Sequence, residues 1–303
     1  MPYRKAWLGV LLLFALTFLA FWPGYFSKLS THSSAHHWHA AGAVLWTVLA
    51  MVQSWTVHNG RIPLHRKSGL AVFALFPLFL VGGMWVIHVE ATTLAGALGS
   101  ASAMGDPDTS QIAQFGFFDP LANIGFAALF WGGLKYRHKV QLHARYMLAT
   151  LVFVVSPIGF RLLSRYVPVI SSDTPETAWR FAFAMGGGNL IALGIALYLY
   201  SLEPKYGRPF LLAAFVIAAQ EITYETLGRI PAWAPFFASL SFLNLPFLLV
   251  LTMIASIGIA WHGWVAGARP KAPNAALAVQ RPIHPAWFSV RFGWKADIRL
   301  YGL

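Results

Sequence analysis

Histidine is the residue type whose spacing most suggests chemistry in this sequence of 303 residues. Neutral imidazole is a good ligand for iron, copper and zinc, and two facing helices can each supply one axial ligand to a haem. Six histidines lie at the ends of long apolar segments. The candidate ligands of a b-type haem are His39, His65, His88 and His143, and the candidate ligands of another metal are His58 and His262.

The spacing of these histidines leaves a second interpretation open. His39 and His58 are about 28 Å apart along one helix at 1.5 Å per residue, which places both at the membrane boundaries. Two-haem b-type cytochromes place such histidines closer together and deeper. The alternative is that the histidines anchor helix ends at the interface, as Trp and Tyr do. The tract His32, His36, His37 and His39 is rich enough in imidazole to bind a transition metal.

A second group of candidates combines carboxylates with arginines inside apolar segments. Glu221 and Glu225 are four residues apart and share one helix face, as do Arg161 and Arg165. All four are expected at a similar depth, so we predict an ion pair between the two helices. With Asn189 they would form a polar pocket for a quinone head group, an anion or protons. The alternative is an ion-pair network that only joins the helices.

The elements that position these residues are expected to be transmembrane helices. Hydrophobic residues make up 57% of the chain and charged residues 11%, against about 25% charged residues in soluble domains. The apolar runs are continuous rather than alternating, which favours an all-α polytopic bundle over a barrel. We predict about eight spans: Ala6–Phe26, His39–Val57, Gly69–His88, Pro120–Tyr136, Ala144–Leu163, Phe181–Ser201, Phe210–Gly228 and Phe242–Val265.

The distribution of basic residues predicts the orientation. Of the 22 Lys and Arg residues, 17 fall at the N-terminus, in the second, fourth and sixth loops and in the C-terminal tail. The positive-inside rule therefore places both termini in the cytoplasm. The third loop, Glu90 to Asp119, contains no Lys or Arg and is expected on the other side.

The chain is expected to divide into a transmembrane bundle, 1–267, and a cytoplasmic tail, 268–303. Apolar residues occupy every even position from Phe288 to Leu300, a period of two that is typical of a strand with one buried face. Such a short extended segment either docks on a protein partner by strand addition or lies at the membrane interface. A disordered tail is the alternative.

Two groups of residues resemble a bacterial membrane-protein family of unknown function, the domain-of-unknown-function 2306 group. The first reads His39-x-x-Gly42, Gln53 and Arg61-x-Pro63-x-His65-Arg66-x-x-Gly69, and the second reads His143-x-Arg145-Tyr146-Met147, with Arg161 further along. The resemblance covers about the first half of the chain. It implies no established activity, only that the His and Arg positions act together.

Composition excludes several functional classes. The chain has no cysteine, which rules out disulfides, thiolate catalysis, iron–sulfur clusters and c-type haem attachment. The net charge of +12 is explained by the positive-inside excess, so no nucleic-acid partner is expected.

Two hypotheses remain for a multi-pass protein of a bacterial inner membrane. One is a redox protein that binds haem b or a quinone, and the other is a non-enzymatic accessory subunit or a transporter. The sequence leaves open whether the chain is an enzyme.

Overall fold

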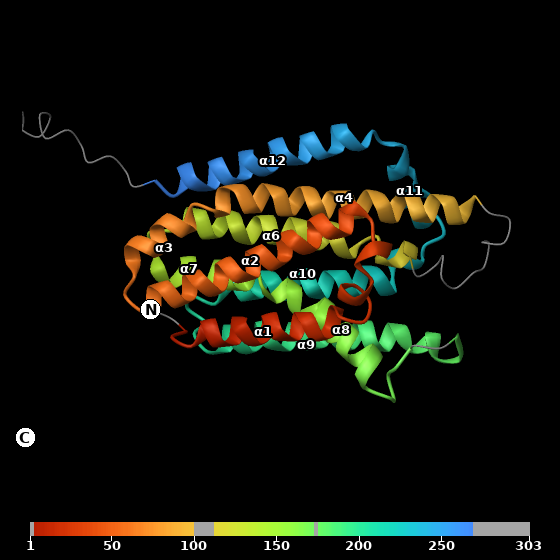
Figure 1. Cartoon of the computed structure of the whole chain (residues 1–303), viewed down its shortest axis with the longest axis horizontal. Coiled ribbons are helices and arrows are strands. Elements are labelled where there is room, and N and C mark those ends of the chain that lie inside the picture. The colour runs from red at the N-terminus through yellow and green to blue at the C-terminus, as the bar shows by residue number, and fades with distance from the viewer. Residues whose placement is uncertain (1–2, 100–111, 173–174, 269–303) are drawn as a thin grey trace, which may run out of the picture. The chain divides into compact units, whose positions relative to one another are not determined.

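The computed structural model describes residues 3–99, 112–172 and 175–268, and over these ranges the fold is all-α (Figure 1). Seven helical stretches within them are long and apolar enough to cross a membrane. This is consistent with an integral membrane protein that crosses the bilayer several times. The helices that form these stretches are α2 (Ser34–His58), α4 (Val72–Leu98), α6 (Phe118–Lys135), α7 and α8 (Val140–Ala149 and Val152–Tyr166), α9 (Phe181–Ser201), α10 (Arg208–Glu225) and α12 (Leu245–Ala266).

Helix α1 (Ala6–Phe21) is apolar but ends five residues before the predicted boundary at Phe26. Its 16 residues span about 24 Å, less than the roughly 30 Å of a hydrocarbon core. Trp22 still has helical backbone angles (φ −54°, ψ −54°), but Pro23 has no backbone N–H to continue the helical hydrogen bonds. A 3₁₀ helix, η1 (Phe26–Thr31), follows.

Two further predicted spans, the third and the fifth, differ clearly from the observed helices. Helix α4 continues to Leu98, ten residues past the predicted end at His88, so Glu90 lies within a helix and not in a loop. The fifth span is broken at Thr150, whose hydroxyl donates to the Met147 carbonyl (2.7 Å) and accepts from Trp46 Nε1 (3.0 Å). The segment before α12 forms separate short helices. The remaining short elements are α3 (Ile62–Gly69), η2 (Pro175–Arg180), η3 (Leu227–Arg229), α11 (Trp233–Ser239) and η4 (Leu240–Phe242).

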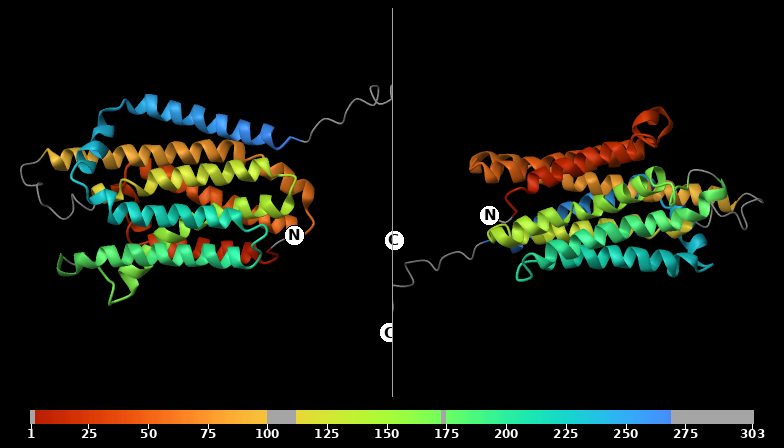
Figure 2. Two further views of the ribbon diagram at one scale, coloured as in Figure 1. Left: turned by 180° about the vertical axis from the view of Figure 1, so that it is seen from behind. Right: turned by 90° about the horizontal axis from the view of Figure 1, so that it is seen from below.

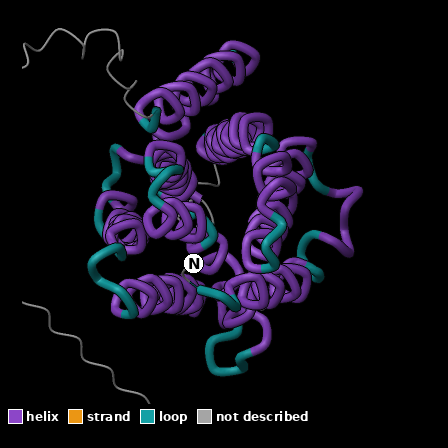
Figure 3. Tube along the Cα trace, turned by 90° about the vertical axis from the view of Figure 1, so that its left-hand side faces the viewer, coloured by secondary structure: helices purple, strands orange, loops and turns teal. Residues whose placement is uncertain are grey.

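The long helices lie side by side, as the further views also show (Figures 2 and 3). Helix α4 packs against α2, α6 and α12, while α9 packs between α8 and α10. Aromatic rings fill the interior beside α4. Phe76 stacks on Phe130 with ring centroids 3.9 Å apart, and Trp46 meets both Phe126 and Phe130 edge-on. This packing makes the interior beside α4 mainly aromatic, while a few buried polar side chains lie midway along their helical stretches, such as Thr47, Thr150 and Asn189.

Basic side chains gather at the end where α1 begins, α2 ends, α6 ends and α10 begins, which we call the basic end (left in Figure 1). There the buried Arg145 guanidinium lies over the rings of Tyr3 (5.0 Å) and Tyr206 (5.6 Å). Arg137 Nη1 donates to the Trp264 carbonyl (2.6 Å) and so holds the end of α12. The predicted cytoplasmic tail and its strand, residues 268–303, fall beyond the described part of the chain except for Ala268.

Candidate functional site

Five titratable side chains from four helices lie in the same region at the end opposite the basic end. They are His36 and His39 on α2, Glu90 on α4, Asp119 on α6 and Arg161 on α8, and we call them the carboxylate cluster. Asp119 interacts electrostatically with each of the other four. None of the five is freely exposed to solvent. Ionisable groups inside a membrane bundle are costly, so a group of five is a candidate functional site.

Two glycines on α4 allow the cluster to form. A Cβ atom on Gly82 would lie 2.8 Å from Trp38 Cδ1 and 3.1 Å from the Cα atom of His39, and one on Gly83 would lie 2.6 Å from the Asn123 side chain. Helices α2 and α6 can therefore approach α4 closely only because these two residues have no side chain. Trp38 Nε1 also donates to the Leu78 carbonyl (3.0 Å), which fixes α2 against α4.

A cavity of about 180 Å³ borders the carboxylate cluster. Its lining residues are His36, Val89, Glu90, Thr93, Ile112 and Phe115. Sites for drug-sized ligands usually measure about 300 Å³ or more, so this cavity suits a small ring or a few waters. An imidazole and a carboxyl on mostly apolar walls can each donate, accept or exchange a proton with whatever occupies it.

The predicted ion pair between Arg161 or Arg165 and Glu221 or Glu225 is wrong, since no such pair occurs among the described residues. Arg161 instead donates to the Pro157 carbonyl (3.1 Å), lies 4.1 Å from the centroid of the Phe21 ring and interacts electrostatically with Asp119. Arg165 lies exposed one turn further along α8. The physical reason is that α9 packs between α8 and α10 and separates their polar faces.

Asn189 on α9 joins the two helices that the arginines and glutamates were expected to join. Its side-chain oxygen accepts a short hydrogen bond from Ser156 Oγ on α8, and its Nδ2 donates to Glu221 Oε2 on α10 (2.6 Å). Gly188 lets α8 and α9 touch, because a Cβ atom there would lie 2.6 Å from backbone atoms of Ser156 and Phe160. Asn189 and Glu221 of the predicted polar pocket are thus brought together.

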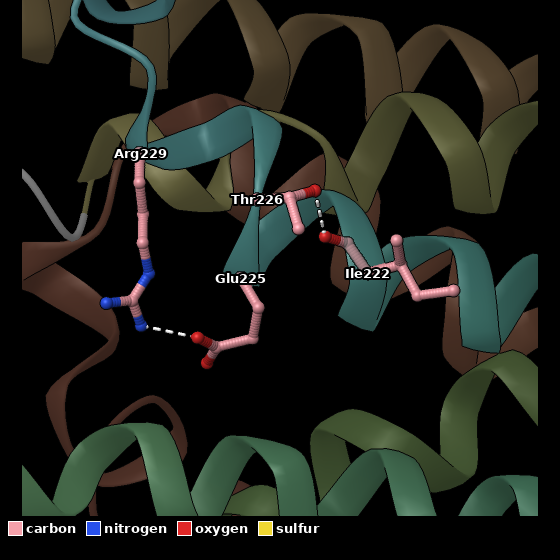
Figure 4. Close-up of polar contacts among 4 residues, drawn as sticks. All are labelled: Ile222, Glu225, Thr226 and Arg229. Atoms are coloured by element: carbon pink, nitrogen blue, oxygen red, sulfur yellow. Dashed lines mark hydrogen bonds and ion pairs between the residues drawn. The ribbon is translucent and has the colours of Figure 1, made fainter.

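Glu225 takes a different partner from Glu221. It pairs with Arg229 one turn later at 2.5 Å, and both side chains are about half exposed (Figure 4). In the same turn Thr226 Oγ1 donates to the Ile222 carbonyl (2.5 Å). This is a local contact within one segment, and exposed pairs of this kind contribute little to stability.

At the basic end, His65 and His143 lie within electrostatic range of each other. His143 Nδ1 lies 2.8 Å from the Gly133 carbonyl, so it must carry the proton, and Nε2 keeps a free lone pair. The Gln53 amide contacts His65 Nδ1 (2.5 Å) and Ser68 Oγ, and in the orientation that satisfies both amide atoms its nitrogen donates to His65. The His65 proton then sits on Nε2. Burial lowers the pKa of His65.

The other two candidate haem ligands are not brought together. The His39 ring stacks on Phe79 (centroids 5.1 Å apart), and its buried Nδ1 has no hydrogen-bond partner. His88 lies six residues after Gly82, about 240° around α4, and its Nε2 contacts the Leu243 carbonyl at 3.1 Å. The two imidazoles therefore face different neighbours of α4.

The two candidate metal ligands and the histidine tract also make separate local contacts. His58 Nδ1 contacts the Ser54 carbonyl (2.7 Å), and His262 Nδ1 accepts from Trp131 Nε1 (2.9 Å). In the tract, His37 Nδ1 contacts the Tyr25 hydroxyl at 2.8 Å. Over residues 3–99, 112–172 and 175–268, no three His, Asp or Glu side chains are arranged to hold one metal ion.

Sequence reasoning missed Glu90 and Asp119 as site residues because it assigned both to the edges of an acidic loop. The available signal was that Glu90 is the single acidic residue in the first 99 positions and lies in an otherwise uncharged helical stretch. A lone acid in such a stretch needs a partner supplied by another helix.

No protein-family model, no curated protein and no solved structure matches this chain.

Proposed function

We propose that this membrane protein binds the head group of a lipid-soluble quinone in the cavity beside the carboxylate cluster. The observation that carries the proposal is the lining of the cavity, in which His36 and Glu90 stand among Val89, Ile112 and Phe115. An apolar ring with two carbonyl oxygens needs this combination. Apolar walls hold the ring, and a small number of polar groups orient it.

The chemistry follows from the two titratable groups. The imidazole of His36 or a protonated Glu90 donates a hydrogen bond to a quinone oxygen, and the same groups take up the protons of a quinol. Asp119 interacts with both Glu90 and His36 and so couples their charges to His39 and Arg161. The electrons are exchanged with a separate redox partner, in keeping with a role as an accessory subunit.

A haem b held by His65 and His143 is the less well supported alternative. His143 has the free Nε2 lone pair that a ligand requires, and its other nitrogen bonds a carbonyl, as is usual for ligating histidines. His65 carries its proton on Nε2 when Gln53 donates to Nδ1, which does not suit a ligand. A visible spectrum of the purified protein, with and without dithionite, tests for a haem.

Quinone binding is tested by tryptophan fluorescence of the full chain in lipid nanodiscs, titrated with a short-chain ubiquinone analogue. Glu90→Leu should weaken binding about ten-fold, because the hydrogen bond from the carboxyl group to the quinone oxygen is lost. Thr93→Leu should weaken it by narrowing the cavity. Thr92→Leu is the matched control. Both threonines are exposed and donate a hydrogen bond to the carbonyl four residues earlier. Of the two, Thr93 lines the cavity.

The proposal fails if the unmodified protein does not bind the analogue. It also fails if Glu90→Leu and Thr93→Leu bind as tightly as the Thr92→Leu control, since the cavity would then not be the binding site.

A further inference from the structure

We propose that a groove between α1 and α2 at the basic end binds an acyl chain of an anionic phospholipid, whose phosphate contacts Arg61. The groove measures about 310 Å³ and is lined by Trp7, Leu11, Met51, Val52 and Trp55. It is separate from the carboxylate cluster, which lies at the other end of α2, and it does not depend on quinone binding.

The lining of the groove favours an acyl chain over a polar ligand. All five side chains are apolar or aromatic, and the groove surface they form is wholly apolar. Leu11 is 43% exposed, so the groove opens toward the surroundings of the bundle. Two tryptophans on its walls are the residues that membrane proteins place at the level of lipid head groups.

The charge beside the groove favours an anionic head group. The Arg61 guanidinium carbon lies 4.6 Å from the centroid of the Trp55 ring, and that ring is part of the groove wall. A guanidinium stacked in this way keeps its N–H groups free for bidentate contact with a phosphate. A second basic residue, Lys5, is the N-cap residue of α1 and lies two residues before Trp7, which lines the groove.

In the described part of the chain, neither Arg61 nor Lys5 forms an ion pair with a carboxylate. Within residues 3–99, the range that contains both helices of the groove, the single acidic residue is Glu90 in the carboxylate cluster. Basic pockets between transmembrane helices are recognition sites for anionic lipids. An anionic phospholipid therefore matches both parts of the site, the apolar groove and the cation at its edge.

The test is native mass spectrometry of the full chain in detergent, titrated with phosphatidylglycerol or phosphatidylcholine carrying the same acyl chains. The protein should bind phosphatidylglycerol about five-fold more tightly, the effect of one basic residue near an anionic lipid. Arg61→Gln should remove this preference, whereas Lys67→Gln, the same change on α3, should keep it.

A second pair of variants tests the groove itself. Leu11→Trp should weaken binding of both lipids by filling the groove. Leu12→Trp should not, because Leu12 points about 100° away around α1 and is 61% exposed. Equal affinity for both lipids, equal losses in Arg61→Gln and Lys67→Gln, or equal binding by the two tryptophan variants would each overturn the proposal.

Discussion

Replacing Gly188 with alanine should destabilise the bundle by forcing α8 and α9 apart. The new Cβ atom would lie 2.6 Å from both the Phe160 nitrogen and the Ser156 carbonyl oxygen, and these are backbone atoms that cannot rotate away. Overpacking of this kind costs about 1–3 kcal/mol. Separating the helices also weakens the Ser156–Asn189 hydrogen bond, and such bonds in membranes average about 0.6 kcal/mol. Alanine also gains up to about 1 kcal/mol in helix propensity, so we expect a net loss of about 1–3 kcal/mol in the free energy of unfolding.

Gly194→Ala on the same helix is the matched control. A Cβ atom there would meet no atom within 4 Å, so only helix propensity acts, and alanine favours a helix over glycine by up to about 1 kcal/mol. Unfolding of the purified variants by sodium dodecyl sulfate in mixed micelles, followed by far-UV circular dichroism, measures both changes. If Gly188→Ala is as stable as Gly194→Ala, the close contact between α8 and α9 is not as described.

Two further predictions concern orientation and pH. The chain lacks cysteine, so Lys67 and Ser30 can each be replaced by a single cysteine in separate variants. On intact spheroplasts an impermeant maleimide should label the cysteine at position 30 and not the one at position 67. Equal labelling would contradict the positive-inside orientation. Burial lowers the pKa of His65, and the Arg66 charge adds to this shift. The unfolded chain therefore binds a proton first, near pH about 6.5, and stability should fall as the pH drops below that value. His65→Gln should reduce the fall measured between about pH 7.5 and about pH 5, and an unchanged fall would exclude this role.

The sequence was sufficient to predict the all-α membrane bundle because long apolar runs have one stable solution in a bilayer. Helix ends were predicted less well where tertiary contacts decide them. Helix α4 continues through Glu90 to Leu98 because Ala91 and Leu94 on its last turns pack in a buried cluster with Phe237 and Ala238 of α11. Local hydropathy at Val89–Thr93 contains no trace of these partners.

The site was only partly predictable for a related reason. The depth of a side chain in the membrane follows from its position along a predicted span. Asn189 and Glu221 were therefore placed at a similar depth, and the structure shows a hydrogen bond between them. The order of helices around the bundle does not follow in this way. Arg161 therefore seemed a partner for Glu221, although α9 lies between their helices and Arg161 interacts electrostatically with Asp119 instead.

The position of α12 has a consequence for biosynthesis. This helix packs mainly against α4 and α6, and Arg137 holds its far end through the Trp264 carbonyl. The contacts among α1, α2, α4, α6, α8, α9 and α10 do not involve it. Chains are made and fold from the N-terminus onward, so these helices can assemble before α12 leaves the ribosome. The last described helix, α12, then joins a bundle in which the helices that carry the carboxylate cluster and the Asn189–Glu221 contact are already present.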